Sequence, residues 1–264
     1  LKLRKDALFP QQFNDQVATL TKFNSQGEIV LPAAGIGTSK NIKYNFDILS
    51  ALMLQNGTNM IENKKAVFGH SNREGYKPGS IALTFYTDFA LPTKQVYTWN
   101  ESFPLDIDAF RQNQLAFFFG YQQDLDYLKA GLTKTKFAAA PLPQLNAQAP
   151  INFANYWLQS VSFKSQHATE AWDFILFMSQ KDNLKKYLDL TKRPTPIKSL
   201  IEEQKNDLEL GAFAQQLLTA QNWYFGKNIE ETRGAFADMI SEVVAGSIVD
   251  SALDRAAQRV GQTF

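Results

Sequence analysis

Residues 45–57 read NFDILSALMLQNG. Asn45 carries a side chain that can cap a helix N-terminus, and the apolar residues after it fit a helix that runs from 46 to 55. Asn56 and Gly57 are residue types that end helices, because both tolerate the left-handed backbone of a C-terminal cap. The pattern therefore predicts a helix with a sharp stop at its C-terminal end.

Segments on either side of this helix mix helix and strand patterns. We expect helices at 11–23, 78–89, 106–112 and 124–130, and strands at 28–36, 115–120, 137–142 and 156–163. Helical patterns dominate afterwards, at 167–179, 181–190, 208–220, 229–245 and 249–260. This order predicts an α/β protein that is helical towards the C-terminus.

Composition narrows the class of protein. The chain has 264 residues, 44% of them hydrophobic, which suffices for one large domain or two smaller ones. Its 27 basic and 26 acidic residues are scattered, so no nucleic-acid partner is expected. It has no cysteine, which excludes disulfides, thiol catalysis and cysteine-bound metal. No apolar run reaches the roughly 18 residues of a membrane-spanning helix.

Catalytic and cofactor motifs are missing from the sequence. The two histidines are His70, in a polar loop, and His167, before a helix, and neither forms an H-E-x-x-H pattern. Residues 35–38 resemble half of a phosphate loop but lack its third glycine and its lysine. The sequence also contains no G-x-S-x-G elbow. We therefore predict no enzyme activity, no cofactor and no metal.

Carboxylates occur in near pairs, and a glycosidase would need two of them to converge across a cleft. Spacing along the chain does not show such convergence, and charge on helix surfaces is the favoured interpretation. The pairs are Asp106 with Asp108, Asp124 with Asp126, and Glu202 with Glu203.

Aromatic residues point to binding. They make up 13% of the chain, and several lie beside amides where a predicted element meets a loop. A sugar packs its C–H face on an aromatic ring, while its hydroxyls bond to amide, carboxylate or guanidinium groups. For any one ring, core packing is the commoner outcome; Trp172, in an apolar helix, is predicted to be core. The rings at such junctions are Tyr44, Trp99, Tyr121, Trp157, Trp223 and Tyr224.

A series of short motifs, in order along the chain, carries a family resemblance. It resembles the carbohydrate-type extracellular solute-binding proteins of ABC importers, the maltose-binding-protein-like family. The motifs are Asp47–Gly57, Ala82–Tyr86, Ala109–Phe110 with Leu115–Tyr121, Ala140–Pro143, Ala171–Ile175, Phe236–Ile240, Val244–Gly246 and Ala252–Leu253.

The resemblance implies a periplasmic-binding-protein-like fold of two α/β lobes joined by hinge strands, with this chain forming mostly the second lobe. Residues 1–9 would be the end of the first lobe or a hinge crossing, and 10–160 the first part of the second lobe. Residues 161–202 would be helices returning to the first lobe, and 203–264 the C-terminal helices of the second. With most of the first lobe outside this chain, the apolar face of helix 167–179 would be exposed, at Trp172, Ile175, Leu176 and Met178.

The resemblance also implies a ligand site. Tyr121 matches the position at which relatives place a stacking Trp or Tyr, and Tyr44 lies near a helix entry that faces the ligand. The remaining candidates are Asn155 and Trp157 near the hinge, Trp223 and Arg233 in a late loop and helix, and Trp99 from the aromatic pattern alone.

The implied function is reversible binding of a sugar or oligosaccharide by hinge closure, as the extracytoplasmic component of an ABC transporter. A monomer is expected in the periplasm or on the outer face of the cytoplasmic membrane, with a permease as partner and a lipid anchor possible through a preceding segment. The same fold could instead bind a peptide, polyamine, phosphate ester or iron complex; acidic ligands would call for Arg193 and Arg233. A carbohydrate-active hydrolase and a purely structural surface protein are the alternatives from other classes.

Overall fold

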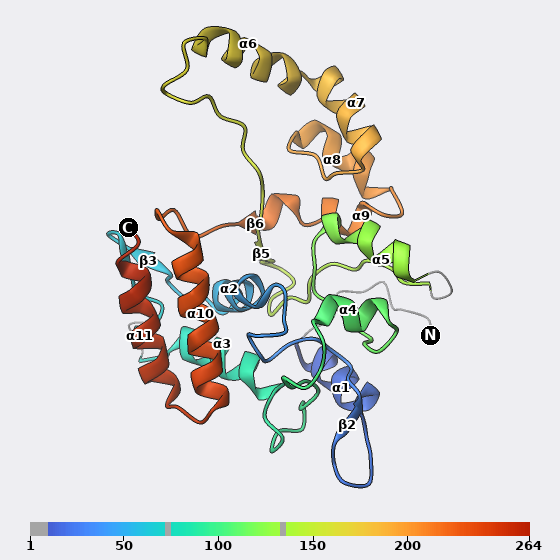
Figure 1. Cartoon of the computed structure of the whole chain (residues 1–264), viewed down its shortest axis with the longest axis vertical. Coiled ribbons are helices and arrows are strands. Elements are labelled where there is room, and N and C mark those ends of the chain that lie inside the picture. The colour runs from blue at the N-terminus through green and yellow to red at the C-terminus, as the bar shows by residue number, and fades with distance from the viewer. Residues whose placement is uncertain (1–9, 72–74, 133–135) are drawn as a thin grey trace.

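The computed structural model describes residues 10–71, 75–132 and 136–264. Helices account for most of the regular structure, and they form a body and, above it in Figure 1, a separate group. The longer helices are α1 (Pro10–Leu20), α2 (Asn45–Gln55), α3 (Pro78–Asp88), α6 (Ala168–Ser179), α7 (Lys181–Thr191), α8 (Lys198–Lys205), α10 (Ile229–Val244) and α11 (Val249–Gly261). The shorter ones are α4 (Asp106–Arg111), α5 (Leu125–Gly131), α9 (Gly211–Ala214) and the 3₁₀ turns η1 (Gln122–Asp124) and η2 (Leu217–Thr219).

The strands are short and paired two by two. β1 (Lys22–Phe23) pairs with β2 (Ile29–Leu31), and β3 (Ile61–Glu62) with β4 (Lys65–Ala66), both antiparallel. β5 (Asn152–Phe153) pairs in parallel with β6 (Ala220–Gln221). This last pair ties the point where the chain leaves the body to the point where it returns.

The body has one main hydrophobic core, built around α2, α3, α10 and α11. Its largest fully buried side chains include Phe68, Tyr86, Trp99 and Phe236. Phe236 of α10 has ring contacts with Phe46 at 4.9 Å, centroid to centroid, and with Phe68 at 5.4 Å. Burial of such aromatic clusters supplies much of a domain's stability.

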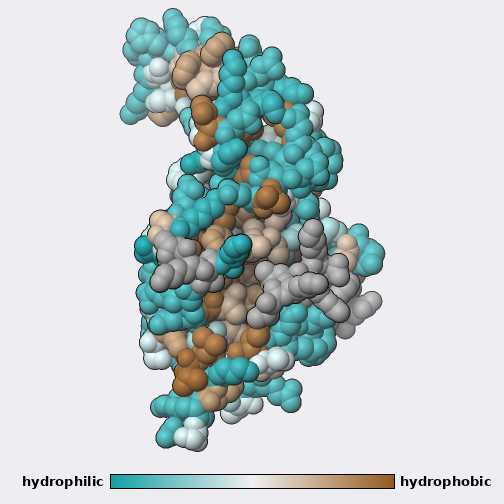
Figure 2. Space-filling model, turned by 90° about the vertical axis from the view of Figure 1, so that its right-hand side faces the viewer, coloured by the Kyte–Doolittle hydropathy of each residue, from teal (hydrophilic) through white to brown (hydrophobic). Residues whose placement is uncertain are grey.

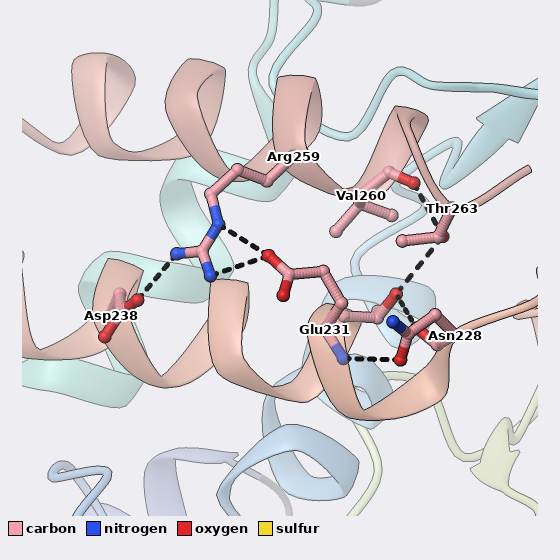
Figure 3. A network of polar contacts seen from close by, with 7 residues as sticks. Asn228, Glu231, Asp238, Arg259, Val260 and Thr263 are labelled. Atoms are coloured by element: carbon pink, nitrogen blue, oxygen red, sulfur yellow. Dashed lines mark hydrogen bonds and ion pairs between the residues drawn. The ribbon is translucent and has the colours of Figure 1, made fainter.

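Helices α10 and α11 are joined by a polar network on their outer side (Figure 3). The Arg259 guanidinium donates to Glu231 Oε1 at 2.8 and 3.0 Å and to Asp238 Oδ2 at 2.6 Å. Asn228 caps α10, since its side chain accepts from the Glu231 N–H at 3.0 Å. The single Arg259 side chain of α11 thus bonds carboxylates on two different turns of α10.

The group above the body is residues 168–205, here called the arm. It contains α6, α7 and α8, and an extended segment connects β5 to α6 (Figure 1). Helix α6 buries no residue, α7 buries only Leu188, and α8 buries Leu200 and Ile201. The helices of the arm therefore bury few apolar side chains.

Most predicted helices are present, with boundaries shifted by a few residues. The helix predicted at 11–23 ends at Leu20, and β1 begins at Lys22. Asn45 was expected as a cap but is the first residue of α2, where its side chain donates to the carbonyls of Ser39 and Ile42. The helix predicted at 208–220 is broken into α9 and η2, and α8 was not predicted.

The strand predictions were mostly wrong. The strand expected at 28–36 is reduced to β2, and that at 115–120 to a single parallel bridge between Phe117 and Ala34. Residues 137–142 and 156–163 form no strand. A strand needs a partner to bond its backbone N–H and C=O groups, and apolar alternation does not supply one.

The environment of α6 overturns one prediction and agrees with another. Trp172 was predicted to be core, but 47% of its surface is exposed. The exposure of the α6 apolar face that the resemblance implied is present: Leu176 and Met178 are exposed as well, and Ile175 is partly buried. Residues 1–9, which were assigned to a lobe end or hinge crossing, lie outside the described residues.

Candidate functional site

A broad groove runs between the body and the arm, and we call it the central groove. Its walls come from the start of α2, residues 115–125, residues 138–143 and 152–159, and the facing parts of α6 and α7. Figure 2 shows apolar residues gathered across the middle of the molecule, beneath the arm. The volume of the central groove is about 2900 Å³. Pockets that enclose a small ligand have roughly 300–1,000 Å³, so the central groove is larger and more open than such a pocket.

Two tyrosines meet on the wall of this groove. Tyr44 directly precedes α2 and Tyr121 directly precedes η1, so both rings are placed by the entry of the chain into a helical turn. The ring of Tyr44 meets that of Tyr121 edge to face, with centroids 5.0 Å apart and planes at 85°. Both side chains are half-buried and both line the groove. They offer a solute ring surface at one place.

The buried Asp124 carboxylate lies beside these tyrosines and is 3% exposed. Its Oδ1 accepts from the Tyr44 hydroxyl at 3.0 Å and from Lys43 Nζ at 2.6 Å, and its Oδ2 accepts from the Tyr121 N–H at 2.9 Å. The Gln123 amide donates to the Tyr44 hydroxyl at 3.3 Å. The wall thus combines rings with amide and carboxylate groups.

Asp47, in the first turn of α2, adds a carboxylate to the same wall. It is buried, and its Oδ2 accepts no hydrogen bond from the described residues. Burial raises the pKa of Asp47, and the nearby Tyr121 hydroxyl and Arg233 charge oppose this rise. Burial likewise raises the pKa of Tyr121, and the charge of Asp47 raises it further. The aromatic pattern did not identify Asp47, although it lies one helical turn from Tyr44 and so on the same face.

Asp106 holds the segment that carries Lys43 and Tyr44. Its Oδ1 accepts from the backbone N–H of Lys43 at 3.0 Å and of Ile107 at 2.8 Å, and its own N–H donates to the Asn41 carbonyl at 3.0 Å. Its Oδ2 is buried with no hydrogen-bond partner in the described structure. Burial raises the pKa of Asp106 to about 7, with the two backbone donors opposing the rise.

Two other predicted site residues lie on the segment that leaves the body. Asn155 and Trp157 follow β5, and both line the central groove. Trp157 is 83% exposed, so its ring faces are available to a solute. The structure therefore brings Tyr44, Tyr121, Asn155 and Trp157 to the same groove.

The remaining predicted site residues do not line the groove. Trp99 has no exposed surface: it stacks on Phe103 and donates from Nε1 to Asn41 Oδ1 at 3.1 Å. Trp223 is buried against Phe236 and donates from Nε1 to Ser50 Oγ at 3.0 Å. Both indoles are enclosed because the body core needs large rings and each N–H finds an internal acceptor. Arg233 lies exposed on α10, paired with Glu230 at 3.2 Å.

No group of three or more His, Cys, Asp or Glu side chains in the described part of the chain could hold a metal ion. No helix among those residues is both long enough and apolar enough to cross a membrane. What the groove offers chemically is ring surface with hydrogen-bonding groups, which suits non-covalent recognition of a polar solute.

Comparison with known proteins gives a family match. The model of the family described as bacterial extracellular solute-binding protein matches residues 2–212. No curated protein matches the sequence.

Solved structures match over nearly the whole chain at low identity. An ABC transporter solute-binding protein from Thermotoga lettingae, bound with α-D-tagatose, is 18% identical with a TM-score of 0.69, over 97% of this chain and 64% of that one. A cyclo/maltodextrin-binding protein complexed with maltotetraose is 13% identical with a TM-score of 0.72, over 98% and 65%. A cyclic α-maltosyl-1,6-maltose-binding protein from Arthrobacter globiformis is 16% identical with a TM-score of 0.70, over 98% and 64%. The chain thus spans slightly less than two thirds of these relatives.

Proposed function

Because more than half of its length matches the family model, this chain belongs to the bacterial extracellular solute-binding proteins, and we propose that it binds a sugar or oligosaccharide reversibly for an ABC importer. The family resemblance seen in the sequence motifs is thereby confirmed. The predicted fold class is confirmed too, since the structure is a helix-rich part of the periplasmic-binding-protein α/β fold.

One observation carries the proposal: Tyr44 and Tyr121 meet at 5.0 Å on the groove wall, surrounded by hydrogen-bonding side chains. A pyranose ring presents C–H groups on its faces and hydroxyls at its rim. The two rings suit the faces, while Gln123, Asn155 and Asp47 suit the rim. The structural relatives named above are described as bound with α-D-tagatose, complexed with maltotetraose, and binding cyclic α-maltosyl-1,6-maltose.

In this proposal the central groove forms one side of a cleft. The assignment of 10–160 and 203–264 to one lobe, and of 1–9 and 161–202 to the end and return helices of another, is part of the same proposal. Solute that contacts both sides stabilises the closed form in proportion to its preference for that form. The extended segment from β5 towards α6 and the β5–β6 pair are where such a hinge would bend.

The proposed roles of the predicted site residues differ. Tyr44, Tyr121, Asn155 and Trp157 would touch the solute, and Asp47 joins them. Trp99 and Trp223 would act from behind the wall, as buried supports. Arg233 would act through its charge on Asp47.

Binding without turnover completes the proposal. The protein would work outside the cytoplasmic membrane as a monomer, deliver its solute to a permease and leave the solute chemically unchanged. A lipid anchor ahead of Leu1 would hold it at the membrane surface. The alternative with a specific feature to recommend it is a phosphate ester, for which Arg193 on the groove wall would supply a cation.

Isothermal titration calorimetry tests the proposal, with protein expressed from its complete coding sequence. D-tagatose, maltotriose and maltotetraose form the sugar set, and spermidine, a tripeptide and glycerol phosphate form the comparison set. We expect saturable binding of at least one sugar. Binding by the comparison set alone, or turnover of a chromogenic glycoside, would contradict the proposal.

Tyr121→Ala should weaken sugar binding about tenfold or more, because the solute loses a ring face. Tyr127→Ala is the matched control, since Tyr127 is an exposed tyrosine on α5 that does not line the groove. If both variants bound the sugar with equal affinity, Tyr121 would not be part of the binding site.

A further inference from the structure

The carboxylate of Asp124 is shared between the two groove tyrosines. Oδ1 accepts from the Tyr44 hydroxyl at 3.0 Å, and Oδ2 accepts from the Tyr121 backbone N–H at 2.9 Å. Tyr44 and Tyr121 come from segments far apart in sequence, one before α2 and the other before η1. A single buried side chain therefore links the two positions, and its own backbone N–H donates to the Tyr121 carbonyl at 3.0 Å.

Both oxygens of Asp124 must be acceptors for this arrangement to hold. An ionised carboxylate has no donor, so it can accept on both sides at once. The amide of asparagine has the same shape but one N–H₂ group, which would face either the Tyr44 hydroxyl and Lys43 or the Tyr121 N–H. Asp124→Asn, which keeps the shape of the side chain, thus leaves at least one N–H donor facing another donor. Such an unpaired buried donor lowers the stability of this arrangement.

Lys43 supplies a positive charge beside the buried Asp124 carboxylate. Its Nζ lies 2.6 Å from Asp124 Oδ1 and 5.0 Å from the centre of the Tyr44 ring. Burial by itself lowers the pKa of Lys43, but the hydrogen bond and charge of Asp124 outweigh this, and the pKa is raised. Lys43 stays cationic, so it pairs with Asp124 and attracts the face of the Tyr44 ring.

The backbone at Gly120 leaves room for this carboxylate. A Cβ at Gly120 would lie 2.8 Å from Asp124 Oδ2 and 2.3 Å from Cε1 of Phe118. Any larger residue would push against the oxygen that holds Tyr121. Position 120 therefore has to lack a side chain for Asp124 Oδ2 and the Phe118 ring to keep these places.

We propose that Asp124 is a positioning residue for solute recognition: by holding Tyr44 and Tyr121 in one edge-to-face arrangement, it sets the shape of the ring surface that the sugar meets. The inference rests on the proposed function, because it assigns Asp124 a role at that same groove. Although it borders the groove, Asp124 is 3% exposed, so it acts through the tyrosines.

The test compares Asp124→Asn with Asp126→Asn. Asp126 lies two residues further on, is exposed, and loses the same charge on substitution. Each protein is labelled with 3-fluorotyrosine, and the ¹⁹F signals of Tyr44 and Tyr121 are assigned with Tyr44→Phe and Tyr121→Phe. Spectra are recorded without sugar, and affinities for maltotetraose and D-tagatose are then measured by calorimetry.

We expect Asp124→Asn to shift or broaden both tyrosine signals and to weaken sugar binding about tenfold or more. Asp126→Asn should leave the signals in place and the affinity within about twofold, as for other exposed surface changes. Gly120→Ala keeps the charge but crowds Oδ2 and, more closely, the Phe118 ring. It is therefore compared in a Phe118→Ala background, where a shift of the Tyr121 signal decides the matter if Asp124→Asn does not fold.

Unchanged Tyr44 and Tyr121 signals in both Asp124→Asn and Gly120→Ala would overturn the inference, as would wild-type affinity in a folded Asp124→Asn. Absence of sugar binding by the wild type is a different result. It would contradict the proposed function, while the spectra of the unliganded proteins would still decide whether Asp124 positions the two rings.

Discussion

Helix α10 of the body and helix α6 of the arm are both rich in apolar residues, yet they have opposite environments. Helix α10 buries six side chains, among them Phe236, Met239 and Ile240, whereas α6 buries none. On α6 the exposed large residues are Trp172, Phe174, Leu176, Phe177 and Met178. The comparison shows that an apolar helical stripe predicts a helix but does not say what covers it.

The same contrast appears in polar contacts. In the body, carboxylates such as Asp106 and Asp124 are buried and bonded to backbone or side-chain donors. In the arm, the ion pair between Lys185 and Glu203 is solvent-exposed on both sides. Body and arm therefore should respond differently to truncation, to pH and to salt.

Replacing a large aromatic side chain by alanine should give the largest difference in unfolding free energy between the body and the arm. Phe236→Ala is expected to lower the free energy of unfolding by about 3–5 kcal/mol, because it opens a cavity among packed rings. Phe177→Ala on α6 should change it by less than about 0.5 kcal/mol, since 55% of that side chain is exposed. Urea unfolding followed by circular dichroism measures both; equal costs would mean that α6 is covered in solution.

Titration of Asp106 should give the next largest effect. Its pKa is raised to about 7 in the folded protein, against an ordinary value of 3.8. Between about pH 4 and pH 7 the unfolded chain has already lost this proton while the folded chain retains it, so stability falls as the pH rises. At about 1.36 kcal/mol for each pH unit, the fall amounts to about 4 kcal/mol at most. Asp106→Asn should abolish this part of the pH dependence in urea unfolding from about pH 3 to pH 8.

Asp207, at the base of the arm between α8 and α9, gives a control of opposite sign. The N–H groups of Leu210 and then Glu209 donate to its carboxylate and lower its pKa. Its contribution to stability is therefore present at neutral pH and is lost as the pH falls below about 4. A wild-type profile that rises between pH 4 and pH 7, and that Asp106→Asn leaves unaltered, would contradict the assignment to Asp106.

Removal of a surface ion pair should give the smallest difference in unfolding free energy between the body and the arm. Arg259→Ala is expected to cost about 1 kcal/mol, because one guanidinium bonds two acidic residues of the neighbouring helix. Lys185→Ala in the arm should cost less, since it removes a single exposed pair. The cost at Arg259 should shrink in 0.5 M salt, and a cost that is insensitive to salt would point to lost packing.

Much of the helical structure could be predicted from the sequence. Helices α2, α3, α10 and α11 lie within a few residues of their predicted ranges, because their periodic apolar residues and end signals are local. The strands expected at 137–142 and 156–163 could not be predicted in the same way. Their formation depends on a partner elsewhere in the molecule, and the described structure offers them none.

The candidate site was predictable only in part. Tyr44, Tyr121, Asn155 and Trp157 lie at the central groove, where ring and amide residues were expected together. Trp99 and Trp223 had the same local signature but are enclosed in the body core. Local sequence does not distinguish a ring that faces a groove from one that faces the core, because both stand at the ends of elements.

Taken alone, the sequence determined the helices, the absence of cysteine chemistry and the family motifs, since these depend on neighbouring residues and on composition. Only the tertiary structure decided that Asp124 joins Tyr44 to Tyr121 and that Asp47 lies beside them. The physical reason is that hydrogen-bond partners come from segments distant in sequence. Tyr44 and Asp124, for example, lie 80 residues apart, and their meeting is set by packing.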